Sequence, residues 1–471
     1  MSHLFHPSVL REYDIRGTFG KTLGPEDAYA LGRSFGTRVV RSEGQDEAGT
    51  CVAVGYDGRL SSPVLEEALV AGLCATGIDV LRIGLGPTPM LYYAVASMPE
   101  VQGGIQITGS HNPPDQNGFK IVFRGGAFFG PDILDLGRLA AEGDWAHADR
   151  ATSSGTVKSV SIMDAYVDRL LRGVDGIDPA LLEGLAIGWD AGNGAAGAVI
   201  ERLTAKLPGK HVLLYTHIDG TFPNHHPDPS VEANLADLRR AVAQGPLDFG
   251  LAFDGDGDRL GVVDSAGRAL AGDQLLMLFA EDVLQRQPGA TVIADIKASS
   301  ALFSRIAALG GKPLMWKTGH SHIKSKMKET GALLAGEVTG HVFFADDYYG
   351  YDDALYAAVR LIAATVRLGR SVAQLRDAMP AMINTPELRF PCSEARKFAV
   401  IAEVGARLAA EGAAVVTIDG LRVSVPGGWW LLRASNTESM LVARAESDSA
   451  EGLAALLAML DAQLTASGVS R

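Results

Sequence analysis

The chain has 471 residues, of which 47% are hydrophobic and 21% charged, and its formal net charge is −13. This length suits about three to four domains of ordinary size. The acidic balance argues against nucleic acids and anionic membranes as partners, although a cleft can be locally basic and bind an anionic substrate.

Targeting and redox features point to the cytoplasm. The N-terminal segment lacks the apolar stretch of a secretory signal, and no run of about 18 apolar residues occurs, so neither export nor a membrane span is expected. Cys51, Cys74 and Cys392 lie far apart and fit no zinc spacing. We expect them to be buried, reduced thiols.

Three passages share one pattern: an apolar run ending near an aspartate, a loop of small residues, a helical stretch and a second apolar run. They are residues 51–84, 185–216 and 291–319, with Asp57, Asp190 and Asp295 at the ends of the first runs. The order strand, turn, helix, strand builds parallel or mixed sheets covered by helices. The pattern therefore predicts three related α/β domains with mixed sheets.

A polar, proline-containing loop, "TGSHNPP" at residues 108–114, separates the apolar runs "GGIQI" and "FKIVF". Phosphoryl transfer needs an acceptor, together with cations that neutralise the phosphate oxygens. Ser110 is a candidate acceptor, and Lys120, Arg259 and Arg16 are candidate cations. The alternative is a plain polar turn in which His111 is merely hydrogen-bonded.

An acidic loop follows the second repeat, in "LAFDGDGDRLGVV" at residues 251–263. Its glycines allow a tight turn that brings Asp254, Asp256 and Asp258 to one point, where they would repel one another without a cation. An EF-hand is excluded, because Arg259 and Ser265 occupy its sixth and twelfth positions. Oxygen ligands beside a phosphate favour Mg²⁺, and the alternative is a solvated acidic turn.

Two further loops offer groups for a phosphorylated sugar. "GEVTGHVFF" at residues 336–344 presents Glu337 and Thr339 for sugar hydroxyls, and His341 for proton exchange near neutral pH. His320 begins a basic helix shortly before it. Loops of this composition also occur without any function.

The last hundred residues have a different pattern, with short strands and glycine turns over 415–447 and an amphipathic helix capped by Ser449. We predict an α+β domain there. Its "RASNTES" turn suits a phosphate dianion through a guanidinium, hydroxyls and an amide, although a plain hairpin turn is the alternative. The relevant side chains are Arg433, Ser435, Asn436 and Thr437.

We therefore expect four closely packed domains. The predicted boundaries are 1–152 with the serine loop, 153–268 with the acidic loop, 269–379 with the Glu337 loop, and 380–471 with the Arg433 turn. The crevice between domains is the default place for a ligand.

Together, the motifs "YDIRG", "TGSHNPPDQNGFK", "DGDGDR", "GEVTGH" and "RASNT", in this order over about 420 residues, resemble those of the α-D-phosphohexomutases. The resemblance is closest to the bacterial phosphomannomutase/phosphoglucomutase branch. It implies three related α/β domains and a C-terminal α+β domain around a central cleft. It also implies reversible phosphoryl transfer between the 1- and 6-positions of hexose phosphates. It also implies a cytoplasmic monomer with glucose 1,6-bisphosphate as activator and intermediate.

The resemblance also implies roles for single residues. Ser110 would carry the phosphoryl group, with Mg²⁺ on its phosphate and on Asp254, Asp256 and Asp258. The side chains around the reacting oxygen would be Lys120, Arg16, Arg259, His320 and His341. Glu337 and Thr339 would read the 3- and 4-hydroxyls. The remaining substrate contacts would be Arg433, Ser435, Asn436, Thr437, Tyr13 and Lys297.

Two positions depart from the branch. Thr339 replaces its usual serine, and Trp430 stands where a smaller residue is expected, so it either packs under the phosphate site or narrows it. Since only the C3 and C4 hydroxyls are read, we expect activity on both mannose and glucose phosphates. "TGSHNPP" and Val338 make glucosamine phosphate a lesser expectation.

Two other classes remain as alternatives. A Mg²⁺-dependent sugar phosphatase would use the same carboxylates and release inorganic phosphate steadily. A non-catalytic sugar-phosphate or metal-binding module would not need a serine loop, an acidic loop and two ligand loops together.

Overall fold

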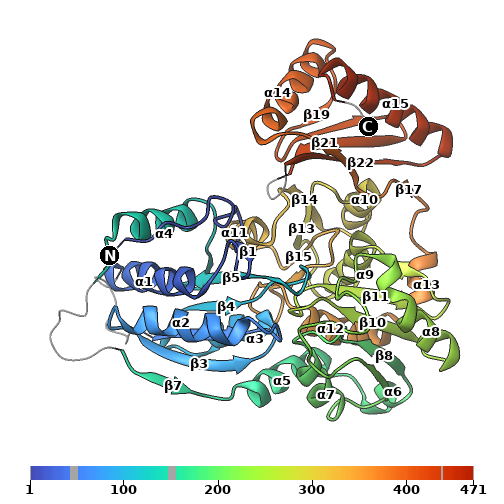
Figure 1. Ribbon diagram of the computed structural model, residues 1–471. Helices are drawn as coiled ribbons and strands as arrows, with labels where there is room; N and C mark the ends of the chain where they lie inside the picture. The colour runs from blue at the N-terminus through green and yellow to red at the C-terminus, as the bar shows by residue number, and fades with distance from the viewer. Residues whose placement is uncertain (1, 43–50, 147–154, 436–438, 470–471) are drawn as a thin grey trace.

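The structure, a computed structural model of the protein, describes residues 2–42, 51–146, 155–435 and 439–469. Four β-sheets organise these residues (Figure 1). The first three are mixed sheets covered by helices, and the fourth is antiparallel. Three α/β bodies and a C-terminal α+β body therefore confirm the predicted fold class.

The first sheet has the strand order β1-β5-β4-β2-β3-β7, with β6 paired to β5. Its strands are β1 (Ile15–Thr18), β2 (Cys51–Tyr56), β3 (Asp79–Leu85), β4 (Val101–Ile107), β5 (Gln116–Phe123), β6 (Gly126–Ala127) and β7 (Val157–Ser159). Its helices are α1 (Pro25–Arg41), α2 (Ser62–Cys74), α3 (Thr88–Ser97) and α4 (Pro131–Glu142). Strand β7 pairs with β3, so this sheet continues beyond residue 152, where we placed the first boundary.

The second sheet has the order β12-β11-β10-β8-β9. Its strands are β8 (Ala186–Asp190), β9 (Lys210–Leu214), β10 (Phe249–Phe253), β11 (Leu260–Asp264) and β12 (Ala269–Leu270). The helices of this part are α5 (Met163–Leu171), η1 (Arg172–Val174), α6 (Pro179–Glu183), α7 (Gly197–Thr204), η2 (Glu232–Leu235) and α8 (Ala236–Gln244).

The third sheet has the order β14-β13-β15-β16. Its strands are β13 (Thr291–Asp295), β14 (Lys312–Trp316), β15 (Leu334–Gly336) and β16 (Val342–Phe344). Its helices are α9 (Gly272–Arg286), α10 (Ser300–Ala308), α11 (His320–Thr330), α12 (Ala354–Leu368) and α13 (Val372–Asp377). Asp353 caps α12 by accepting from the Tyr356 amide, and Gly369 ends the helix in the left-handed conformation.

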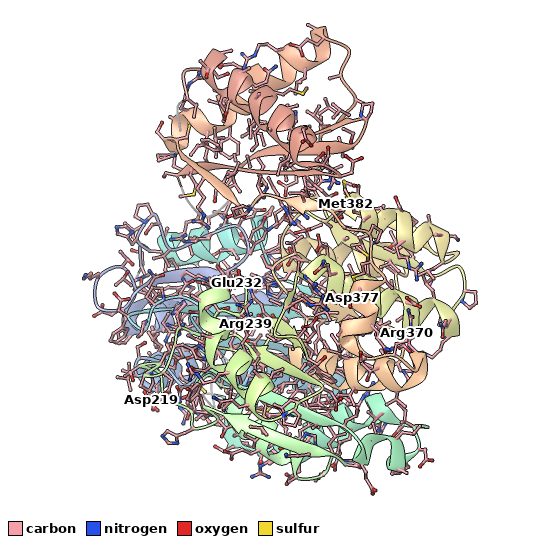
Figure 2. All side chains as sticks on the ribbon, turned by 90° about the vertical axis from the view of Figure 1, so that its right-hand side faces the viewer. Asp219, Glu232, Arg239, Arg370, Asp377 and Met382 are labelled. Carbon is pink, nitrogen blue, oxygen red and sulfur yellow. The ribbon has the colours of Figure 1, made fainter. Side chains whose placement is uncertain are left out.

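The fourth sheet has the order β17-β22-β21-β20-β19, with β18 also paired to β22. Its strands are β17 (Ile383–Asn384), β18 (Leu388–Pro391), β19 (Val415–Val416), β20 (Leu421–Val425), β21 (Gly428–Ala434) and β22 (Met440–Ser447). The helices are α14 (Glu394–Ala410) and α15 (Ala450–Ala466), and Ser449 caps α15 as predicted. Met382 lies where the chain enters this body (Figure 2).

The repeated pattern of the sequence is confirmed as three parallel strand–helix–strand units. They are β2-α2-β3, β8-α7-β9 and β13-α10-β14. Asp57, Asp190 and Asp295 lie at or just beyond the carboxyl ends of the first strands, and all three are buried. Ligands of open α/β sheets bind at this edge, so the repeats place three such edges in the molecule.

Packing joins the first three bodies more closely than the fourth. A single cluster of buried apolar side chains includes Leu91, Trp189, Phe279 and Leu355, from the first three bodies. The C-terminal body has its own core and rises above the others in Figure 1. A small apolar contact of Ile296 with Trp429 and Leu431 connects it to the third body.

The cysteines differ in burial from the prediction. Cys51, Cys74 and Cys392 are unpaired, as expected, but each is only half-buried. No helix within the described ranges combines the length and the apolar character needed to cross a membrane.

Candidate active site

The four predicted loops are equivalent in structure, since each is the turn of an antiparallel hairpin. The serine loop joins β4 to β5, the acidic loop joins β10 to β11, and the Glu337 loop joins β15 to β16. The Arg433 turn joins β21 to β22. In the first three bodies, the first strand of the hairpin is also paired in parallel within its sheet. Each of these three loops therefore leaves its sheet at the carboxyl edge of the parallel strands.

The serine loop is held from behind by the buried guanidinium of Arg59. The guanidinium donates to the carbonyl oxygens of Ser110 and Asn112 at 2.7 Å each, Pro113 at 2.5 Å and Gln116 at 2.8 Å. Asp57 pairs with Arg59 at 3.1 Å and accepts from the Thr108 hydroxyl at 2.8 Å. Ser110 itself has a φ of 50°, which is uncommon for a residue other than glycine. The loop is thus held in a strained conformation, and such strain persists only where the surrounding contacts fix the backbone.

The Ser110 hydroxyl points at the acidic loop. It donates to Asp254 Oδ2 at 2.9 Å and lies 3.2 Å from His111 Nδ1. Burial, Arg259 and Arg16 keep the pKa of His111 well below its usual range, so its ring is neutral. A β-carbon at Gly255 would lie 2.3 Å from the Ser110 carbonyl oxygen, so the two loops touch only because that position is glycine.

The acidic loop gathers three buried carboxylates. Asp254, Asp256 and Asp258 are 0% exposed, and a ligand oxygen from each lies within 4.8 Å of the others. Burial and the two neighbouring carboxylates raise the pKa of Asp254 well above its usual range. One oxygen of Asp256, Oδ1, has no hydrogen-bond partner within the described residues. Clustered carboxylate oxygens with unsatisfied lone pairs suit a hard divalent cation, so these residues fit Mg²⁺.

Predicted cations surround these carboxylates. Lys120 Nζ contacts Asp256 at 2.7 Å and also pairs with Asp258, and these carboxylates raise the pKa of Lys120 although burial acts to lower it. Arg16 donates to Asp14 at 2.6 Å and to Asn112 at 2.9 Å. The Arg259 side chain lines the cavity, and its Nε has no hydrogen-bond partner. Lys120 therefore contacts the acidic loop, Arg16 contacts the serine loop, and Arg259 lines the cavity.

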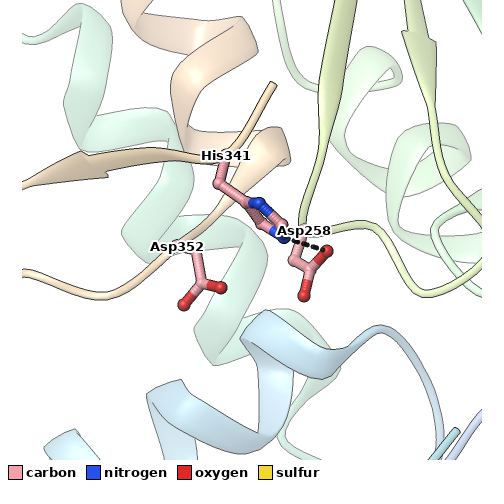
Figure 3. Close-up of side chains that lie close together, drawn as sticks. All are labelled: Asp258, His341 and Asp352. Carbon is pink, nitrogen blue, oxygen red and sulfur yellow. Dashed lines mark ion pairs between the residues drawn. The ribbon is translucent and has the colours of Figure 1, made fainter. Parts of the chain in front are cut away.

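His341 joins the acidic loop to the Glu337 loop (Figure 3). Its Nε2 lies 3.2 Å from Asp258 Oδ1 and its Nδ1 lies 3.0 Å from Glu337 Oε2. Burial acts to lower the pKa of His341, but Asp258 and Glu337 outweigh it and raise the pKa to about 9. Burial acts to raise the pKa of Glu337, but the contacts with His341, Lys297 and the Gly319 amide outweigh it and lower the pKa to about 2. His341 is therefore an imidazolium held between two carboxylates.

The second histidine, His320, is neutral, in contrast to the cationic His341. The rings of His320 and His341 stack with centroids 5.7 Å apart. Burial, Lys324 and Lys120 keep the pKa of His320 well below its usual range. Asp352 lies near His341 (Figure 3). Its carboxylate is 3.6 Å from His320 Nδ1 and 2.9 Å from Lys324 Nζ. One cationic and one neutral imidazole thus lie side by side.

Four of the predicted substrate groups, Lys297, Thr339, Arg433 and Ser435, line a cavity of about 980 Å³ between the bodies, whereas Tyr13 and Glu337 are not part of its lining. Its lining includes His111, Arg259, Lys297, Thr339, Arg433 and Ser435, which come from all four bodies. Arg433 pairs with Asp419 at 2.9 Å, and Lys297 lies 3.8 Å from Asp295. Tyr13 donates to the Thr318 carbonyl at 3.1 Å, and so reaches the third body from the first. The predicted Asn436 and Thr437 lie outside the described residues.

Several residues that build this site were not singled out from the sequence. Arg59 holds the serine loop, and Thr88 donates to Asp256 at 2.5 Å. Asp352 accepts a hydrogen bond from Lys324 and lies beside His320. Asp57 was recognised only as the end of a strand. The "DGR" that follows β2 carries a usable signal, because a charged pair directly after a buried strand is expected to lie at the sheet edge.

The structure separates the two departures from the family pattern. Trp430 is 0% exposed and packs in the core of the C-terminal body, while Arg433 lines the cavity, so Trp430 does not narrow the cavity beside Arg433. The hydroxyl of Thr339 is 3.3 Å from His341 Nδ1, and its side chain lines the cavity. Of the two, only Thr339 is placed to contact a ligand.

Comparisons with known proteins agree along the whole chain. Phosphoglucomutase/phosphomannomutase models match as alpha/beta/alpha domain I at residues 8–136, domain II at 164–267, domain III at 271–382 and the C-terminal domain at 387–463. Phosphomannomutase/phosphoglucomutase of Pseudomonas aeruginosa is 45% identical over 460 residues, or 98% of this chain and 96% of that protein. Phosphoglucomutase of Neisseria gonorrhoeae is 44% identical over 445 residues, or 94% of this chain and 93% of that protein. A crystal structure of a family protein from Burkholderia thailandensis superposes with a TM-score of 0.90 at 42% identity, covering 99% and 98% of the two chains.

Proposed function

Because the chain belongs to the phosphoglucomutase/phosphomannomutase family of α-D-phosphohexomutases, we propose that it interconverts the 1- and 6-phosphates of both mannose and glucose. The observation that carries the proposal is the contact of Ser110 Oγ with Asp254 at 2.9 Å. A buried hydroxyl that donates to one of three clustered carboxylates, with cationic side chains nearby, is suited to receive and release a phosphoryl group.

We assign the phosphoryl carrier to Ser110. In the active enzyme its phosphate would be donated to the free O1 or O6 of a hexose monophosphate, giving a hexose 1,6-bisphosphate. The sugar hydroxyl loses its proton as the new P–O bond forms and the bond to Ser110 Oγ breaks. The bisphosphate then turns within the cavity, and Ser110 takes back the other phosphate while the freed sugar oxygen is protonated.

Asp254, Asp256, Asp258 and the phosphate on Ser110 would hold Mg²⁺, which when bound neutralises charge on the phosphate oxygens. Lys120 and Arg16 place further positive charge beside the serine loop. We assign the proton transfers to the stacked pair His320 and His341, one neutral and one cationic. A donor and an acceptor of protons are both needed, since each half of the cycle reverses the other.

The far end of the substrate is assigned to the groups across the cavity. Arg433 and Ser435 would bind the phosphate that is not reacting, together with Asn436, Thr437 and Lys297. Glu337 and Thr339 would bind the C3 and C4 hydroxyls. This set has no member assigned to the C2 hydroxyl, where mannose and glucose differ. The cytoplasmic location, the monomeric state and the boundaries of the four domains remain our proposals, and we place the first boundary after β7.

The first test is to measure initial rates on mannose 1-phosphate and glucose 1-phosphate with Mg²⁺ and catalytic glucose 1,6-bisphosphate. We expect comparable kcat/KM values. A ratio above about a hundredfold, or roughly 2.7 kcal/mol, would mean that a residue reads the C2 position. No turnover of either sugar would overturn the proposed substrates and favour glucosamine phosphate. Steady release of inorganic phosphate would overturn the mutase proposal in favour of a phosphatase.

The second test concerns the carrier. Ser110→Ala should abolish turnover and remove the phosphate that intact mass spectrometry finds on the active enzyme, while hexose phosphate still binds. Ser34→Ala is the matched control, because Ser34 is equally buried in the same body and only accepts from Trp145 at 3.0 Å. It should keep turnover within about twofold of wild type. Unchanged turnover in Ser110→Ala would remove the assignment.

A further inference from the structure

A second cavity of about 530 Å³ lies at the contact of α5 and η1 with α9 and α12, and shares no lining residue with the sugar-phosphate cavity. Its volume falls in the range of small-molecule sites, about 300–1,000 Å³. Guanidinium groups dominate its lining, which contains Arg169, Arg172, Arg286, Arg360 and Arg367. In a chain with a net charge of −13, such a concentration of cations is unusual.

Two buried carboxylates fix three of these guanidinium groups from behind. Asp346 pairs with Arg286 at 2.5 Å and with Arg360 at 2.9 Å. Asp282 pairs with Arg367 at 3.2 Å and with Arg286 and Arg360 at 3.3 Å each. Three guanidinium groups share these two buried carboxylates, and Arg286 also lies 3.8 Å from the exposed carboxylate of Asp347. The buried carboxylates thus fix the orientation of these three guanidinium groups before any ligand binds.

The open side of the cavity is formed by the other two arginines. Arg169 lies over the rings of Tyr348 and Tyr349, at 4.7 and 5.2 Å from their centroids. Arg172 is exposed and forms no ion pair within the described part of the chain. The carboxylates at this rim belong to Asp175 and Asp347, and both residues are exposed. Solvent screens those two charges far more than it screens the buried interior.

We propose that this cavity binds a small anion with two or more phosphate groups, such as a nucleoside triphosphate or inorganic tripolyphosphate. Guanidinium forks match phosphate oxygens with paired hydrogen bonds. The donors come from α5, η1, α9 and α12, so one phosphate cannot reach them all, whereas a short phosphate chain can. The alternative is an ion-pair network that only ties α9 to α12 and to the segment of Asp346 and Asp347.

The experiment is calorimetric titration of inorganic tripolyphosphate and of GTP into the full chain at about 0.15 M ionic strength. The test variant is Arg172→Ala with Arg367→Ala. The control is Arg138→Ala with Arg240→Ala, two exposed arginines on α4 and α8 whose loss changes the net charge equally. Single Arg172→Ala serves if the double variant folds poorly.

We expect wild type and control to bind tripolyphosphate alike and the test variant to bind about a hundredfold more weakly, since each lost charge-assisted bond removes roughly tenfold. The test variant should keep kcat/KM within about twofold of wild type, which shows that the sugar-phosphate cavity is intact. Tighter binding of GTP would show that the base is recognised, and equal binding would show that the phosphate chain suffices. Absence of binding, or equal affinity in all three proteins, would overturn the proposal and leave only the ion-pair network.

Discussion

Replacing Arg59 by Met removes the support of the serine loop without touching the reacting groups. The side chain is 1% exposed and its guanidinium donates to four carbonyl oxygens of that loop, besides pairing with Asp57 at 3.1 Å. A buried carbonyl that loses its donor costs about 1–3 kcal/mol, and a broken buried ion pair costs about 3–5 kcal/mol. Because the loop can relax and expose some of these groups, we expect a net loss of about 4 kcal/mol.

The effect on turnover should exceed what lost stability explains. Ser110 depends on this support for its left-handed φ of 50° and for its contact with Asp254. A misplacement of about 1 Å can lower kcat/KM by about a hundredfold. Rates measured well below the unfolding transition, together with urea unfolding, separate the loop position from the population of folded enzyme.

The matched control is Phe35→Ala. Phe35 is fully buried in the same body, packs on Phe123 and Phe128, and belongs to the core, away from the serine loop. Its truncation should cost about 3–5 kcal/mol and leave kcat/KM near wild type at low temperature. A wild-type kcat/KM in Arg59→Met, or an equal fall in both variants, would refute the role given to Arg59.

Three other predictions follow from the same geometry. Mg²⁺ at a hundred times its dissociation constant should stabilise the wild-type chain by about 2.7 kcal/mol in thermal unfolding and leave Asp256→Asn unshifted; equal shifts in both would contradict the metal site. Burial raises the pKa of Asp295 to about 6, and neither of its oxygens has a hydrogen-bond partner. The stabilisation by the protonated Asp295 carboxyl is therefore full below about pH 4 and is lost as the pH rises through 6. The free energy of unfolding of Asp295→Asn, measured in urea, should therefore rise by about 3 kcal/mol relative to that of wild type between pH 4 and 7. A constant difference across that range would show that burial does not control the group. Trp430→Phe should lower the free energy of unfolding by about 1–2 kcal/mol and leave the ratio of mannose to glucose kcat/KM unchanged, because the ring packs in the core; a changed ratio would place it at the substrate.

The sequence by itself was sufficient for the local structure and for the kinds of chemistry. Alternating apolar runs and glycine turns predicted the three strand–helix–strand units, since these patterns act within a few residues of the chain. The spacing of Asp254, Asp256 and Asp258 predicted their convergence for the same reason. The side-chain types also predicted a phosphate acceptor, a cation site and a sugar-phosphate cavity, most of whose residues the structure brings together.

Tertiary packing decided which of these groups meet. Ser110 and Asp254 are 144 residues apart in the chain, and their contact depends on how two sheets present their hairpin turns to each other. The support by Arg59, the burial of Trp430 in the core of the C-terminal body and the five-arginine cavity also arise between elements distant in sequence. Periodicity determines which face of a strand or helix is apolar, but it does not determine which faces pack together. The residues that hold and orient the candidate site therefore became visible only in the folded chain.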